Sequence, residues 1–114
     1  MQLQCIRIRI LDGKTDQVRE WMASLRSRAG EVLASLEAEA MSDEAVFLST
    51  DGGVDHLYIY SRARDLEQAS AIFQESARPV DVEFKEVIQT CLDLESVTPL
   101  ELAFAADLGS RLVL

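Results

Sequence analysis

The sequence predicts an α+β fold in which a four-stranded antiparallel sheet carries helices on one face. Three segments, at 2–11, 55–61 and 100–105, alternate with period two, which is typical of strands that are buried on one face, and the run 45–50 indicates a further strand. Between the first and second of the expected strands, and again between the third and fourth, apolar residues recur with the period of an amphipathic helix. We expect strands near 2–11, 44–50, 55–61 and 99–106, with helical segments at 14–40 and 65–92.

The first strand is predicted by the alternation of Ile6, Ile8 and Ile10 with polar neighbours. β-branched residues favour the pleated, half-buried surface of a sheet, so the isoleucine side should face the core. The dipeptide Asp12-Gly13 then ends the strand in a turn.

The first helical segment has an apolar stripe that is interrupted by one glycine. The stripe consists of Val18, Trp21, Met22, Leu25, Ala29, Val32, Leu33 and Leu36. Gly30 lies inside it, and an interior glycine costs a helix up to about 1 kcal/mol relative to alanine. We therefore expect a break or kink between Arg28 and Glu31 rather than one straight helix.

The second half of the chain contains the remaining predicted elements. Asp51-Gly52-Gly53 supplies residues that tolerate positive φ, which predicts a hairpin loop between the second and third strands. Asp65 is placed to cap a helix, Pro79 should interrupt that helix, and Asp81 could cap a second one. After Pro99, the alternating run 100–105 predicts the fourth strand.

Length and charge bound the function classes. The 114 residues indicate one domain over 1–114, and 20 acidic against 11 basic residues give a net charge of −9. This charge disfavours binding to nucleic acid and to anionic membranes, because both need basic surfaces.

Cysteine usage and the N-terminus set further expectations. Cys5, Cys91 and His56 are too few for a structural zinc site, and we expect neither a metal nor another cofactor. Isolated cysteines, no apolar span and no signal-like N-terminus together predict a cytoplasmic, soluble protein with reduced thiols.

The element order corresponds to the ferredoxin-like plan, in which the first and third strands are adjacent at the centre of the sheet. The helices should cover the isoleucine side, and the opposite side should present Cys5 together with the candidate ligand-binding residues. These candidates are Arg7, Arg9, His56, Tyr58 and Tyr60. Guanidinium groups beside aromatic rings could hold a planar organic acid, but an ordinary wet sheet face or a dimer contact has the same composition.

Two charged features are open to more than one interpretation. Arginines on the open side need compensation, which could come from Glu101 on the final strand, from a partner subunit or from a bound anion. Residues 31–61 contain seven acids and no Lys or Arg, a pattern that we interpret as a solvated acidic face rather than a cation site.

Several short motifs resemble an uncharacterised bacterial family of small dimeric α/β-barrel proteins, a domain family of unknown function. The motifs are Val18-Arg19-Glu20-Trp21, Glu39-Ala40-Met41, Glu44-Ala45-Val46-Phe47-Leu48, Leu57-Tyr58-Ile59-Tyr60 and Pro79-Val80-Asp81. The resemblance implies a homodimer in which two sheets pack open face to open face. In that family the position of Phe84 often carries a His, so chemistry that depends on such a His is not expected here.

No catalytic motif is present, so two hypotheses about function follow. The first is a homodimer that binds a small organic molecule in its barrel cavity. The second is a small cofactor-independent enzyme, an oxygenase or isomerase, with His56 as the proton-transfer group and Tyr58 or Arg9 stabilising charge. The second hypothesis requires these three side chains to converge within hydrogen-bonding distance.

Overall fold

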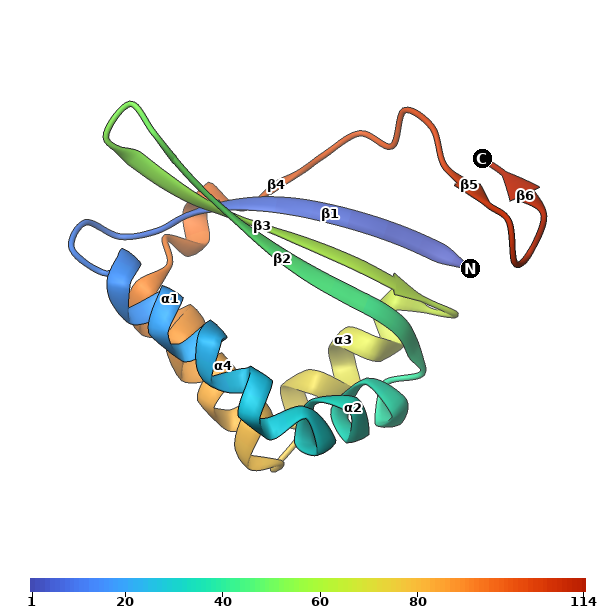
Figure 1. The fold of residues 1–114 in the computed structure, drawn as a ribbon, viewed down its shortest axis with the longest axis horizontal. Helices are drawn as coiled ribbons and strands as arrows, with labels where there is room; N and C mark the ends of the chain where they lie inside the picture. Colours follow the sequence, from blue (N-terminus) through green and yellow to red (C-terminus); the bar gives the residue numbers. More distant parts are fainter.

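The computed structural model describes residues 1–114 and shows helices on one face of a four-stranded antiparallel sheet (Figure 1). The strands are β1 (Gln2–Arg9), β2 (Met41–Asp51), β3 (Val54–Ala63) and β4 (Thr98–Pro99). Their order is β2-β3-β1-β4, so the predicted adjacency of the first and third strands at the centre is confirmed. β2 and β3 form a hairpin whose turn contains Gly52 and Gly53, both with positive φ.

The helical segments are divided as the sequence predicts. The first comprises α1 (Thr15–Ser24), the 3₁₀ turn η1 (Leu25–Arg28) and α2 (Ala29–Ala38). The predicted break is therefore confirmed, and it takes the form of a tighter turn just before Gly30. The second comprises α3 (Leu66–Glu75) and α4 (Pro79–Cys91), followed by the short 3₁₀ turn η2 (Leu94–Ser96). None of these helices combines the length and the apolar character needed to cross a bilayer.

The core lies between the sheet and the helices. Leu57 of β3, Val18 of α1 and Cys91 of α4 have no exposed surface, and Ile8 of β1 is 3% exposed. Trp21 and Met22 are partly buried against this cluster, as expected from the apolar stripe. The isoleucine side of β1 therefore faces the helices, and its removal from water contributes stability roughly in proportion to the area buried.

The two predicted helix caps have different outcomes. Asp65 is confirmed as the N-cap of α3, because its carboxylate accepts a hydrogen bond of 3.1 Å from the backbone N–H of Gln68. The prediction for Asp81 is wrong: α4 begins at Pro79, and Asp81 lies buried in the first turn. Proline suits the first helical position because its missing N–H would have no partner there, so Asp81 is free for another contact.

The prediction of a strand over 99–106 is also wrong. β4 contains only Thr98 and Pro99, and the chain leaves the sheet after the backbone N–H of Leu100 donates to the carbonyl of Cys5. Residues 100–105 have no strand structure, and a small separate hairpin of β5 (Ala106–Asp107) and β6 (Leu112–Val113) ends the chain. Alternation produces a strand only where a neighbouring strand pairs with it, and no backbone of this chain pairs with residues 101–104 between Leu100 and the terminal hairpin.

Candidate functional site

The residues singled out from the sequence lie together on the sheet face opposite the helices, which we call the open face. The strand register pairs Arg7 with Tyr58, Arg9 with His56, and Cys5 with Tyr60 across β1 and β3. The predicted grouping is therefore confirmed, whereas a ligand-binding role for these residues stays a prediction.

The two arginines on the open face differ in their partners. The Arg9 guanidinium contacts Asp93 at 3.1 Å and Asp12 at 3.7 Å. Arg7 has no carboxylate within salt-bridge distance, and neither arginine pairs with Glu101. Glu101 is therefore not the compensating group within the chain, because the segment that carries it departs from the sheet edge, whereas Asp93 directly follows α4.

The aromatic residues of the open face are not joined to one another by hydrogen bonds. The rings of His56 and Tyr58 are tilted by 53° with centroids 6.5 Å apart, and no hydrogen bond joins His56, Tyr58 and Arg9. Burial and the nearby carboxylate of Asp43 raise the pKa of Tyr60 above its ordinary value. The convergence that the enzyme hypothesis required of His56 is absent.

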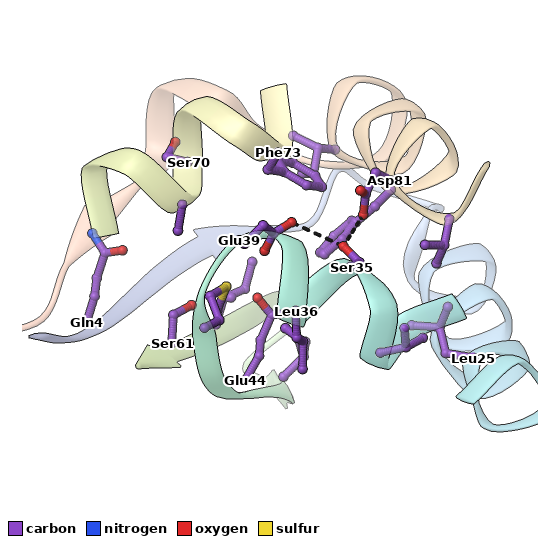
Figure 2. Close-up of a pocket in the computed structure, with 18 of the residues that line it drawn as sticks. Gln4, Leu25, Ser35, Leu36, Glu39, Glu44, Ser61, Ser70, Phe73 and Asp81 are labelled. Carbon is purple, nitrogen blue, oxygen red and sulfur yellow. Dashed lines mark hydrogen bonds between the residues drawn. The ribbon is translucent and has the colours of Figure 1, made fainter. Parts of the chain in front are cut away.

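A cavity of about 240 Å³ lies on the other side of the sheet, between the strands and the four helices. Fifteen of its 22 lining residues are hydrophobic, and they come from β1, β2, β3, α1, η1, α2, α3 and α4. Figure 2 shows the labelled polar residues around this space, with Glu44 and Ser61 on the strands and Ser35 and Asp81 on the helices. An apolar cavity with a few polar groups is the usual form of a small-molecule site.

A row of three polar side chains crosses the sheet at one end of the cavity, and we call it the polar row. Gln4 of β1 and Glu44 of β2 are both register partners of Ser61 in β3. Each residue lies an even number of positions from inward-facing apolar residues on its strand, so all three point towards the helices. None of the three side chains makes a hydrogen bond within the protein, which leaves their donors and acceptors available.

Glu44 is the one carboxylate in the polar row. Solvent reaches its side chain through the open end of the cavity, yet the protein atoms around the carboxyl group raise its pKa to about 7. Loss of hydration is the main cause, and the nearby negative charges of Glu39 and Asp81 add to it. Glu44 therefore changes its charge close to neutral pH.

A second group of polar residues in the cavity wall is internally satisfied. The Ser35 hydroxyl lies 3.1 Å from Oε1 of Glu39 and 2.6 Å from Oδ1 of Asp81, as the dashed lines in Figure 2 show. The Ser76 hydroxyl donates to Oδ2 of Asp81 at 2.6 Å. Because a hydroxyl has one proton, Ser35 can donate to Asp81 while a neutral Glu39 donates to Ser35. Burial raises the pKa of Glu39, which favours this arrangement.

The interpretation of 31–61 as a solvated acidic face is therefore wrong at one position. Glu39 is 6% exposed, whereas Glu44 is exposed to solvent although it also lines the cavity. A sequence signal was available for Glu44, because it continues the alternation of Val46 and Leu48 on the inward side of β2. Counting the charges of the segment did not reveal this position, since a count contains no information about the side of the strand on which a side chain lies.

Phe84 closes the cavity on the helix side. Its ring lies 5.1 Å from that of Trp21 and 5.7 Å from that of Phe73, measured between centroids. Aromatic pairs at these separations contribute packing energy and cannot transfer protons. Glu44 is a titratable group of the cavity wall whose side chain makes no hydrogen bond within the protein.

Comparison with protein families places the chain in a known group. Residues 1–109 match the model of a family of unknown function, DUF6176. The chain belongs to this family. No curated protein matches it. Membership of DUF6176 agrees with the expectation of a family of unknown function, whereas the dimeric barrel that the motifs implied stays a prediction.

Proposed function

We propose that this DUF6176 protein binds a small organic cation, with the apolar part of the ligand in the helix–sheet cavity and its charged group at the polar row. The observation that carries the proposal is an apolar cavity that ends in Gln4, Ser61 and Glu44, whose side chains have no partners in the protein. The predicted small-molecule site is thus assigned to the helix side of the sheet rather than to the open face.

The cavity volume sets the size of the ligand. An apolar cavity of roughly 150 Å³ is large enough to bind benzene. The 240 Å³ here is suited to a single aromatic ring or branched alkyl group with a short polar extension. Val46, Ile59 and Phe84 supply apolar contacts for such a body.

The charge of the cavity wall indicates the sign of the ligand. Glu39, Glu44 and Asp81 line the cavity, and no Lys, Arg or His does. An anion would be repelled, whereas a protonated amine would form a charge-assisted hydrogen bond with ionised Glu44. The side-chain oxygens of Gln4 and Ser61 can accept hydrogen bonds from the remaining N–H groups of the amine.

The test is calorimetric titration with 2-phenylethylamine, using 2-phenylethanol and 3-phenylpropionate as neutral and anionic analogues. We expect the amine to bind most tightly, and the Glu44→Gln variant to weaken amine binding by about tenfold while leaving the alcohol unaffected. Affinity for the amine should rise as the pH increases through about 7, because Glu44 ionises there. In Glu44→Gln this pH dependence should disappear, since the amine itself loses its proton only near pH 10.

The matched control is Glu37→Gln, which removes a carboxylate from the exposed side of α2, away from the cavity lining. Equal binding of the amine and the carboxylate, or an amine affinity unchanged in Glu44→Gln, would contradict the proposal.

A second candidate function is cofactor-independent proton transfer on a substrate held in the same cavity, as in an isomerase. The specific observation is the position of the Glu44 carboxylate in the wall of an apolar cavity without a hydrogen-bond partner, where loss of hydration raises its pKa to about 7, a value that suits a general acid–base group at neutral pH. Glu44 replaces His56 in this role, because His56 lies on the open face without hydrogen-bonded partners. Exchange of substrate carbon-bound protons with solvent, lost in Glu44→Gln, would favour catalysis over binding alone.

We further propose a ferredoxin-like fold that dimerises through its open face, as in the dimeric α/β barrels. The strand order and the one-sided helices support the fold, and the uncovered face supports dimerisation. Phe47 on that face is 62% exposed, and only 13 of the 114 residues are buried. Closed two-fold dimers are the commonest assembly of such chains. Light scattering at micromolar concentration should give twice the monomer mass, and a monomer mass would refute this proposal.

A further inference from the structure

The last fifteen residues form a segment whose apolar side chains are largely exposed, although its hairpin shares a small pocket with Leu3 and Tyr60 of the sheet. We call residues 100–114 the C-terminal arm. Its exposed apolar side chains are Leu100, Leu102, Phe104, Leu108, Leu112, Val113 and Leu114. Figure 1 shows the arm leaving the sheet on the side away from the helices. One ion pair of 3.0 Å, from Arg62 to Asp107, ties its hairpin to the chain.

The total surface is larger than a compact monomer of this size requires. The accessible surface is 7475 Å², about 1,200 Å² more than the roughly 6,200 Å² expected from the mass of 12.7 kDa. The radius of gyration, 14.6 Å, also exceeds the value of about 13 Å for a compact chain. A standard protein interface buries about 800 Å² on each partner, so the excess is enough for one.

Charge complementarity indicates what covers the arm. Arg7 is the one arginine of the open face without a carboxylate, whereas Arg9 and Arg62 are paired. Glu101 is the acidic residue of the arm without a basic partner, since Asp107 is bound to Arg62. Arg7 on the open face and Glu101 on the arm are therefore two unmatched charges of opposite sign, and Arg111 is a further charge of the arm that has no partner within the chain.

We propose that in the homodimer each arm lies across the open face of the other copy, so that Leu102 and Phe104 contact Phe47 and Glu101 pairs with Arg7. The inference rests on the dimer proposed above and specifies its contacts. The exposed apolar side chains of both surfaces are then removed from water together. The acidic chain, with net charge −9, is repelled by an anionic membrane, and the arm itself has only one arginine against its two acids.

The test measures the dimer dissociation constant by analytical ultracentrifugation over a dilution series of the full chain. Arg7→Glu and Glu101→Arg should each weaken dimerisation by about tenfold or more, because each brings two like charges together. The double variant should restore the wild-type constant to within about threefold, since the pair is re-formed with reversed charges. Phe104→Asp should weaken the dimer without a change in circular dichroism.

The matched control is Glu20→Arg, a charge reversal at an exposed residue of α1 outside both surfaces. A monomeric wild-type protein would overturn the dimer itself, and this inference with it. A wild-type dimer whose dissociation constant is unchanged by Arg7→Glu, Glu101→Arg and Phe104→Asp would leave the dimer intact and overturn the role of the arm.

Discussion

Replacing Leu57 by Ala is expected to lower the free energy of unfolding by about 2–5 kcal/mol. Leu57 lies at the centre of β3, has no exposed surface and contacts the core formed by β1 and the helices. The loss has two causes, the transfer free energy of the deleted methyl groups and the void that the rigid sheet cannot close. Urea denaturation monitored by circular dichroism measures it.

Leu33→Ala is the matched control for this experiment. It makes the same chemical change in α2, where Leu33 is 63% exposed, so stability should change by no more than about 0.5 kcal/mol. If the two variants lost the same stability, the inward side of β3 would not form the core.

Replacing Asp81 by Ala is expected to cost about 1–3 kcal/mol of stability, although the residue is charged and the substitution favours a helix. Its carboxylate accepts hydrogen bonds of 2.6 Å from both Ser35 and Ser76 in a buried setting. The variant leaves the Ser76 hydroxyl without this acceptor and disrupts the contact between Ser35 and Glu39. Thermal and urea unfolding should both detect the loss.

The comparison for Asp81 is Glu86→Ala, which removes an exposed carboxylate from the same helix. Glu86→Ala should be neutral within about 0.5 kcal/mol. If Asp81→Ala left the stability unchanged, the two serine hydroxyls would have found other partners, and the network would not be needed to hold α2 against α4.

Some site features were within reach of the sequence. The pairing of Arg7 with Tyr58 and of Arg9 with His56 follows from two alternating strands joined by the expected order of elements. The inward position of Glu44 could equally have been predicted, since Glu44 lies on the same side of its strand as Val46. The cavity itself was not, because its volume depends on how far the helices stand from the sheet, and periodicity carries no such distance.

Local sequence features were enough to predict the element order, the break before Gly30, the cap at Asp65 and the core face of β1, because each depends on backbone preference or on the period of apolar residues. Other contacts depend on how distant parts of the chain pack together in three dimensions. Asp93 rather than Glu101 neutralises Arg9, Asp81 joins Ser35 and Ser76 instead of capping a helix, and the run after Pro99 leaves the sheet. These outcomes depend on tertiary contacts between residues that are far apart in the sequence. The same residue types at the same spacing are compatible with several different sets of such contacts.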